Sequence, residues 1–249
     1  MSLRVLILSD SHLFQSKSKE LFGVGTYRAL DVTVAHIRNR RERFDLMVAL
    51  GDLSEDGSKE AYRNFEALTS GLADSVIWVR GNHDRFDLLD GEQTTPYCQP
   101  EWHSGPWHLI FLDTTLRGRD EGRLAADEME RLGRFLSTYR DGHILVFMHH
   151  QPVPVGSAFI DELALQNREQ FLKIVSGHHQ IKGIIFGHVH QLVDVQVDQL
   201  RMLSVPATSV QFRPHSEQLD FDQLRHGYRI VTLSPDGQLD TSVEMVDPG

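Results

Sequence analysis

Five short apolar runs, each ending in aspartate, asparagine or histidine, constrain this chain more than any other feature. They are RVLILSD (4–10), FDLMVALGD (44–52), DSVIWVRGNHD (74–84), GHILVFMHH (142–150) and IKGIIFGHVH (181–190). Continuous runs of this length, rich in Val, Ile and Leu, are typical of strands buried on both faces. Segments with helical spacing of apolar residues lie at 27–43, 58–71, 125–140 and 167–175. The order of these segments predicts an α/β fold.

The remaining segments are predicted to add further strands and one loop. A pair of strands is expected around 102–113, and the pattern from 191 to 246 is hairpin-like, with a Pro-Asp-Gly turn at 235–237. We therefore expect mostly antiparallel β structure near the C-terminus. The stretch 150–165, which contains two prolines and a glycine, is predicted to form a loop over the pocket. Because the chain shows no repeat or linker, we expect residues 1–249 to form a single domain.

Composition argues against several classes of protein. The formal net charge of −10 disfavours nonspecific binding to nucleic acid, which requires a basic surface. With one cysteine, Cys98, a disulfide within the chain is excluded. The N-terminal apolar run is shorter than that of a signal peptide, and no run approaches the roughly 20 apolar residues that cross a bilayer. We therefore expect a cytoplasmic protein with no nucleic-acid or membrane partner.

The residues at the ends of the five apolar runs form a set of candidate metal ligands. In open α/β sheets the functional crevice lies beyond the carboxyl ends of the strands, so these distant residues are expected to meet. Gly187 is predicted to allow the close backbone turn that presents the two histidines after it. An all-oxygen and nitrogen set suits Mn, Fe, Zn or Co, and seven ligands suit two ions that share a carboxylate. The candidates are Asp10, His12, Asp52, Asn82, His149, His188 and His190.

Each motif taken alone has a simpler interpretation. A His-x-His at a strand end is more often a surface or hydrogen-bonded pair, and Gly-Asp is a common turn dipeptide. In Gly-Asn-His-Asp, Asp84 could simply cap the following helix. What favours a metal site is that all five apolar runs end this way in one chain.

The series Asp-x-His, Gly-Asp, Gly-Asn-His-Asp, His-His and Gly-His-x-His, from residue 10 to residue 190, resembles the calcineurin-like metallophosphoesterases. More closely, LFGVGT (21–26), PATSVQFRPH (206–215) and HGYR (226–229) resemble the bacterial 3′,5′-cyclic AMP phosphodiesterases of class III. With these segments the resemblance covers nearly the whole chain. One departure is Gln151, where relatives often carry Pro or His, and it concerns the rim of the pocket rather than the ligands.

The resemblance implies a fold and a metal centre. The fold is a four-layer αββα sandwich of two mixed β-sheets flanked by helices. The cofactors are two divalent or mixed-valence ions, chosen from Fe, Mn, Zn and Co, with Asp52 as the shared ligand. The first ion would be held by Asp10, His12, Asp52 and His190, and the second by Asp52, Asn82, His149 and His188. His150 is assigned a place beside the site, because neighbours in an extended strand point to opposite faces.

The resemblance also implies an activity. It is hydrolysis of 3′,5′-cyclic AMP to the 5′-monophosphate, by in-line attack of a hydroxide that bridges the two ions. His83 would contact the phosphate and protonate the leaving 3′ oxygen. Asn82, His12 and His190 are also expected to contact the substrate. Asp84 could orient the His83 ring or cap a helix, and both interpretations remain open.

Other functions and residues stay open at this level. The alternatives are a phosphodiesterase of the same fold that acts on glycerophosphodiesters or 2′,3′-cyclic nucleotides, and a non-catalytic protein-binding scaffold. A homodimer is compatible with the sequence. Arg80 could help a phosphate or form a buried ion pair, and Arg213 and His215 could touch the nucleotide or a dimer partner. Six histidines are interpreted as solvated or packed: His36, His103, His108, His143, His178 and His179.

Overall fold

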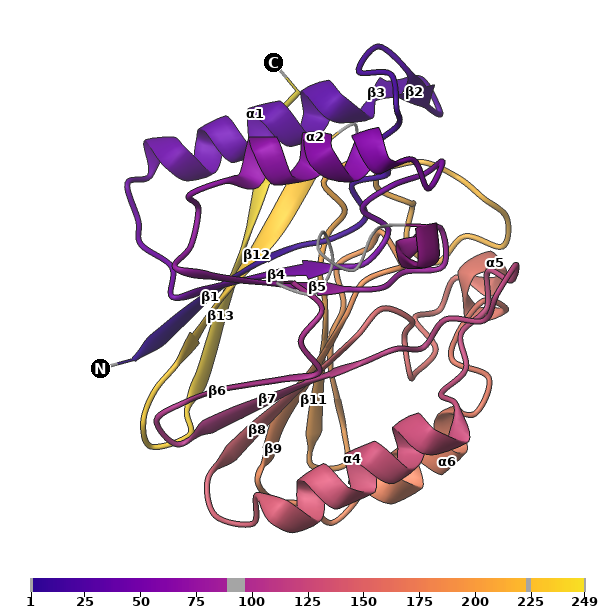
Figure 1. Ribbon diagram of the computed structural model, residues 1–249. Helices are drawn as coiled ribbons and strands as arrows, with labels where there is room; N and C mark the ends of the chain where they lie inside the picture. Colours follow the sequence, from indigo (N-terminus) through magenta and orange to yellow (C-terminus); the bar gives the residue numbers. More distant parts are fainter. Residues whose placement is uncertain (1, 89–96, 223–224, 249) are drawn as a thin grey trace.

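Two mixed β-sheets packed face to face form the centre of the molecule in the computed structural model, which describes residues 2–88, 97–222 and 225–248 (Figure 1). The first sheet has the order β13 (Leu239–Val246), β12 (His226–Leu233), β1 (Leu3–Leu8), β4 (Leu46–Leu50) and β5 (Ser75–Val79). The second has the order β10 (Asp194–Val197), β11 (Leu200–Ser204), β9 (Ile181–Phe186), β8 (His143–Met148), β7 (Trp107–Leu112) and β6 (Glu101–Ser104).

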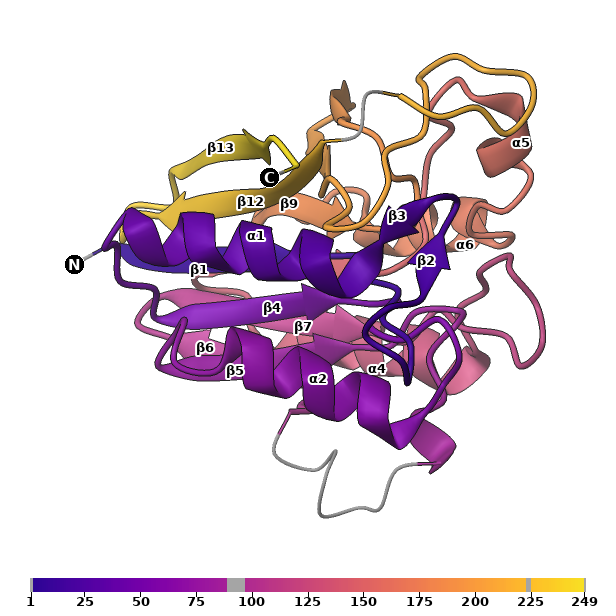
Figure 2. The same ribbon diagram turned by 90° about the horizontal axis from the view of Figure 1, so that it is seen from above.

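Helices cover the outer face of each sheet, which completes the predicted four-layer αββα sandwich. The first sheet is covered by α1 (Thr26–Asn39) and α2 (Lys59–Thr69), and the second by α4 (Ala126–Thr138) and α6 (Arg168–Val175). All four predicted helices are therefore present, with slightly different bounds. The short helix α5 (Ala158–Asp161) and the hairpin of β2 (Glu20–Leu21) and β3 (Val24–Gly25) lie at one end of the sandwich (Figure 2). A 3-10 turn, η1, spans Phe86–Leu88, and the rest of the helix expected after Asp84 lies outside the described residues.

The central strands are buried on both faces, as their continuous apolar sequences predict. In β1, Val5 and Ile7 belong to the core between the sheets, whereas Leu6 and Leu8 belong to the core beneath the helices. All four side chains are fully buried. Because side chains alternate between the two faces of a strand, a strand with a sheet on one side and helices on the other has few positions for polar side chains, and in β1 the one such residue, Arg4, lies near the start of the strand.

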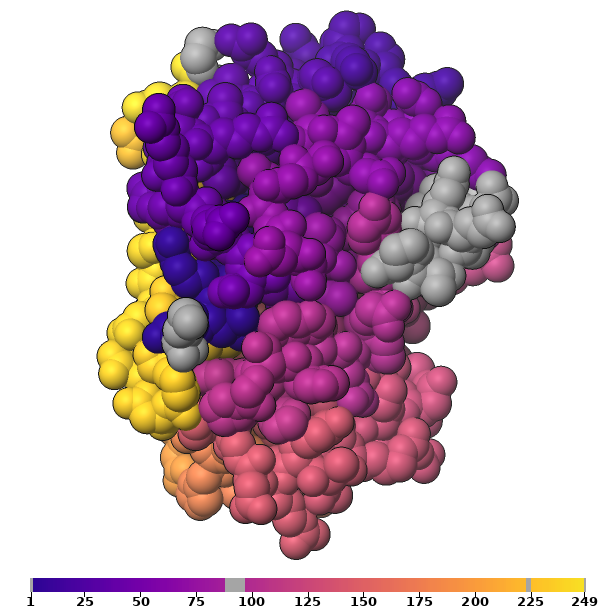
Figure 3. Space-filling view, turned by 60° about the vertical axis from the view of Figure 1, so that its left-hand side comes forward, coloured from indigo at the N-terminus to yellow at the C-terminus, as the bar shows by residue number. Residues whose placement is uncertain are grey.

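The C-terminal strands are divided between the two sheets. The hairpin β10–β11 is antiparallel and extends the second sheet, where β11 also pairs in parallel with β9. The hairpin β12–β13 is antiparallel and pairs with β1 in the first sheet. In the space-filling view the yellow C-terminal segment accordingly lies beside the indigo N-terminal one (Figure 3). The sequence therefore predicted both hairpins, but not the division between sheets.

Candidate metal centre

Three candidate ligands from the first and the ninth strand ends form one compact group. The Nε2 atom of His190 lies 3.3 Å from Oδ1 of Asp10 and 3.2 Å from Nε2 of His12. Asp10 and His12 follow β1, and His190 follows β9, so the two sheets each contribute to the group. All three residues are buried. One ion could contact an atom from each, because their ligand atoms lie within 4.8 Å of one another.

A second group forms around His149. Its Nε2 atom lies 3.2 Å from Oδ2 of Asp52 and 3.1 Å from Oδ1 of Asn82. The same Oδ2 atom of Asp52 is 3.7 Å from Nε2 of His12, which belongs to the first group. The carboxylate of Asp52 therefore lies between the two groups, where a shared ligand would have to lie.

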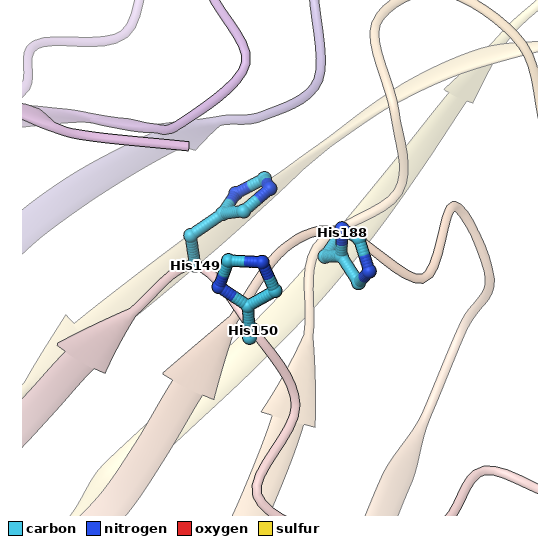
Figure 4. Close-up of side chains that lie close together, drawn as sticks. All are labelled: His149, His150 and His188. Carbon is cyan, nitrogen blue, oxygen red and sulfur yellow. The ribbon is translucent and has the colours of Figure 1, made fainter. Parts of the chain in front are cut away.

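His188 contacts the second group from the side of β9. Figure 4 shows its ring beside those of His149 and His150, with ring centroids 5.2 Å and 4.6 Å away. The buried Nε2 atom of His188 has no hydrogen-bond partner within the described part of the chain. Both ring nitrogens of His150 are already occupied, since Nδ1 contacts Oγ1 of Thr114 at 2.7 Å and Nε2 contacts the carbonyl of Asp120 at 3.1 Å. His150 therefore has no ring nitrogen free to bind a metal, and its ring packs beside His188.

The backbone at five candidate ligands is in the left-handed region. A positive φ is uncommon for residues other than glycine, and such conformations cluster at functional sites. Hydrogen bonds hold two of these turns, because the Asp10 carboxylate accepts from the amide of His188 at 3.1 Å and Oδ1 of Asp52 accepts from the amide of His83 at 2.9 Å. The φ angles are 54° at Asp10, 46° at His12, 51° at Asp52, 65° at His188 and 48° at His190.

Gly187 has a different role from the one predicted. Its own φ is not among the positive ones, so the unusual turn is made by the histidines after it. A Cβ atom at Gly187 would lie 2.3 Å from Oγ of Ser9 and 3.0 Å from Oδ2 of Asp10. Glycine is required here because the two strand ends approach each other closely.

The charges in the centre fit a cation. Burial alone would raise the pKa of Asp52, but the neighbouring His149, His12 and His83 hold that pKa well below its usual range. Burial, together with the charges of His150 and His149, keeps the pKa of His188 well below its usual range, so its ring is neutral and can bind a metal. Burial would lower the pKa of His149, but Asp52 and Asp10 raise it to about 9 in the metal-free chain, so a metal ion bound there would displace a proton. Ionised oxygens, imidazoles and the unpartnered Nε2 of His188 together suit divalent metal ions.

Glu55 is a site residue that the sequence analysis missed. Its Oε2 atom lies 2.8 Å from Nδ1 of His12 and 3.1 Å from Nδ1 of His83. Burial alone would raise the pKa of Glu55, but hydrogen bonds from the two histidines lower it to about 2. An ionised Glu55 orients both rings, as carboxylates beside metal-bound histidines commonly do. A glutamate three residues after Asp52 gives no such signal in a single sequence.

Asp84 neither orients the His83 ring nor begins a helix in the described structure. Its Oδ2 atom accepts from the amide of Gly81 at 2.9 Å, and Oδ1 accepts from the amides of Leu53 and Ser54 at 3.1 and 3.2 Å. The hydroxyl of Tyr62 donates to Oδ1 at 3.2 Å. Asp84 thus fastens the loop after β5 to the loop after β4, and it is Glu55 that contacts the His83 ring.

A cavity of about 280 Å³ opens beside the two groups. Its lining includes six of the predicted site residues together with several apolar side chains. Loop 150–165 contributes Phe159 and Leu163, as the prediction of a loop over the pocket requires. The polar lining consists of His12, Asp52, Glu55, Asn82, His83, Asp120, His188 and His190.

Two further residues left open by the sequence lie beside this cavity. Arg80 is close to the carboxylates of Asp87 and Asp113, at 3.6 and 3.8 Å, and lines a neighbouring groove instead. The side chain of Gln151 is buried and donates to the carbonyl of Ile160 at 2.8 Å, so it supports α5.

Arg213 and His215 lie outside the cavity lining as well. Arg213 forms an exposed ion pair with Asp220 at 3.0 Å, and His215 is exposed with a φ of 61°.

No described helix is long and apolar enough to cross a membrane.

Comparison with known proteins identifies the family. The chain is 34% identical to the 3′,5′-cyclic adenosine monophosphate phosphodiesterase CpdA of Pseudomonas aeruginosa, over 99% of this chain and 91% of that protein. It is 33% identical to the protein of the same name from Vibrio vulnificus, over 100% of this chain and 92% of that protein. A dimetal phosphatase from Danio rerio shares the fold, with a TM-score of 0.63 and 14% identity over 98% of this chain and 99% of that one. The family model for calcineurin-like phosphoesterases matches residues 3–192, and the chain belongs to that family.

Proposed function

We propose that this protein hydrolyses 3′,5′-cyclic AMP to the 5′-monophosphate. The observation that carries the proposal is similarity over the full length to relatives named for this activity, including segments outside the metal motifs. The cavity beside the histidine and aspartate groups supports it, since its lining contains both polar groups that suit a phosphate and apolar groups that suit a base. The proposal also assigns the protein to the cytoplasm and allows a homodimer.

Within this proposal, two metal ions are held by the two groups of ligands. The first would contact Asp10, His12, Asp52 and His190, and the second Asp52, Asn82, His149 and His188. This division is supported by the short distances within each group and by the position of Asp52 between them. The chemistry of the ligands favours iron and manganese, with zinc and cobalt also compatible.

Bound metal ions would act as Lewis acids and lower the pKa of water near the phosphorus. The protein supplies the remaining proton transfer. Burial would lower the pKa of His83, but the hydrogen bond to Glu55 and the charges of Asp52 and Glu55 raise it to about 10 in the metal-free chain. Without bound metal, both nitrogens of the ring therefore carry a proton at neutral pH. Because Nδ1 contacts Glu55, Nε2 is the atom that can donate to the leaving 3′ oxygen.

The test is turnover of 3′,5′-cyclic AMP, 2′,3′-cyclic AMP and a phosphomonoester by the manganese-loaded wild type and by Asn82→Ala. We expect the 3′,5′-cyclic diester to be preferred and the variant to lose most activity. Asn39→Ala is the control, because Asn39 is exposed at the end of α1. Equal rates for wild type and Asn82→Ala would contradict the role of Asn82.

The same panel separates the alternatives. Preference for 2′,3′-cyclic AMP, or for a glycerophosphodiester added to the panel, would indicate a different phosphodiesterase. Absence of both bound metal and activity toward every diester would favour a protein-binding scaffold.

A further inference from the structure

The apolar lining of the cavity is built from three separate segments. The β2–β3 hairpin contributes Leu21 and Phe22, the α5 region contributes Phe159 and Leu163, and the segment after β11 contributes Phe212 and Leu219. The hairpin and α5 lie at the same end of the molecule in Figure 2. Because one cavity is lined by Phe22 and also by the candidate ligands, one small molecule could contact both.

A series of four rings leads from the surface toward the metal centre. Phe22 packs against Phe221 with ring centroids 4.8 Å apart, and Phe221 lies 6.0 Å from Phe212. Phe212 is stacked on His190, at 4.4 Å and an angle of 7° between the rings. The inner end of this ring series is therefore fixed on a candidate ligand, and its outer end is Phe22.

Phe22 presents an exposed aromatic ring at the tip of the β2–β3 hairpin. The residue is 54% exposed, and within the described residues its ring packs against one other ring, the tilted ring of Phe221. Phe22 and Gly23 are the two residues between the paired Leu21 and Val24, and their φ angles of 51° and 82° are those of a two-residue hairpin turn, in which a bulky residue is uncommon. The turn places an exposed aromatic ring on a cavity that the candidate ligands also line, so the ring is available to contact a molecule bound there.

We propose that Phe22, at the outer end of the ring series, stacks on the base of the cyclic nucleotide while the phosphodiester lies at the metal centre. This inference rests on the proposed function. Aromatic side chains stack on the face of a base, and every base has such a face. Phe22 thus contributes to binding through the base and takes no part in the reaction at phosphorus.

The test uses Phe22→Gly with two substrates, 3′,5′-cyclic AMP and ribose 3′,5′-cyclic phosphate, which lacks the base. Since glycine adopts positive φ readily, the thermal midpoint should not fall. Stacking contributions predict that KM for 3′,5′-cyclic AMP rises between about 5-fold and about 150-fold, with kcat little changed. KM for the substrate without a base should stay the same. Phe22→Trp should retain the wild-type KM, and Val195→Ala, at an exposed apolar residue of β10, is the control.

The outcomes separate this inference from the function on which it rests. Wild type that hydrolyses neither substrate would contradict the proposed function. Hydrolysis of 3′,5′-cyclic AMP with the same KM in Phe22→Gly would contradict the base contact, as would an equal rise of KM for both substrates. Calorimetry adds a readout without turnover: Phe22→Gly should weaken binding of adenosine 5′-monophosphate and leave binding of ribose 5-phosphate unchanged. Equal losses for both ligands would overturn the inference.

Discussion

Among the individual residues of the metal centre, two carboxylates each contact two histidines. Oδ2 of Asp52 lies near His149 in one group and His12 in the other, while its Oδ1 accepts the amide of His83. Glu55 likewise contacts both His12 and His83 with one oxygen. A change at either carboxylate should therefore affect both groups of the site.

Glu55→Gln tests this coupling. The amide keeps the size of the side chain but removes the negative charge that orients the two rings. We expect kcat/KM and metal affinity to fall by about 10-fold to 100-fold, as is typical for residues that support metal ligands. Steady-state kinetics and metal titration measure the two effects. Glu169→Gln, at an exposed residue of α6, is the control, and unchanged values in Glu55→Gln would refute the role of Glu55.

The stability of the metal-free protein should depend on pH through His83. Its folded pKa of about 10 lies above the ordinary 6.5, so its contribution is complete below pH 6.5 and is lost as the pH rises toward 10. In the presence of a metal chelator, the midpoint of thermal unfolding should therefore fall more between pH 7 and pH 9.5 for the wild type than for His83→Ala. Parallel curves for the two proteins would show that the Glu55–His83 contact adds nothing to stability.

The sequence predicted which residues at the strand ends belong to the candidate site, but it did not predict the contacts that these residues make. The ends of five apolar runs pointed to Asp10, Asp52 and His188 because only a shared site explains so many polar ends together. Glu55 was missed, and neither role left open for Asp84 matches its contacts in the described structure. The contacts of Glu55 and of Asp84 depend on how two loops approach each other. No local pattern in a single sequence shows this approach.

At the scale of elements, glycines let the strand ends come together. A Cβ atom at Gly81 would lie 2.2 Å from Oδ1 of Asp52, and one at Gly51 would lie 2.3 Å from Nδ1 of His149. Gly187 has the same relation to Ser9 and Asp10. In the loops after β4, β5 and β9, the backbone at these glycines therefore lies directly against side chains of the site. This close approach holds the candidate ligands near one another.

Gly187→Ala should separate these loops. The added methyl group meets Ser9, Leu50 and Asp10, so we expect a loss of about 1–3 kcal/mol in unfolding free energy and weaker metal binding. Urea unfolding and metal titration measure both. Gly133→Ala is the matched control, because this helical glycine has open space around its Cβ position, and it should gain about 0.4–1 kcal/mol. Equal stability of Gly187→Ala and wild type would contradict the steric argument.

The sequence predicted the elements well because the apolar pattern reflects burial. Strands such as β1 and β4 are buried on both faces and read as continuous apolar runs. The pairing of β12 with β1 was not predicted, because antiparallel pairing across more than 200 residues leaves no local signal. Helix α5 was also missed, because a segment of four residues is too short to show helical periodicity.

At the scale of the whole molecule, the site lies where the two sheets meet. Candidate ligands follow β1, β4 and β5 of one sheet and β8 and β9 of the other. We propose that residues 1–249 act as one domain, because neither sheet alone contains the full set. Metal binding should then stabilise the sandwich as a unit.

Removal of metal tests that link. Ions that bind only the folded chain add stability, about 2.7 kcal/mol at a concentration 100 times Kd, so chelation should lower the thermal midpoint by at least about 5 °C. The Asp52→Asn variant should show a much smaller change, because it lacks the shared carboxylate. An identical shift in both proteins would mean that the metal acts elsewhere.

The most direct measurement is anomalous X-ray diffraction from crystals of the manganese-loaded protein, recorded at the manganese edge. Two peaks should appear about 3.5 to 4 Å apart, one on each side of the Asp52 carboxylate. The first should lie beside Asp10, His12 and His190, and the second beside Asn82, His149 and His188. A single peak, or peaks away from Asp52, would contradict the central claim.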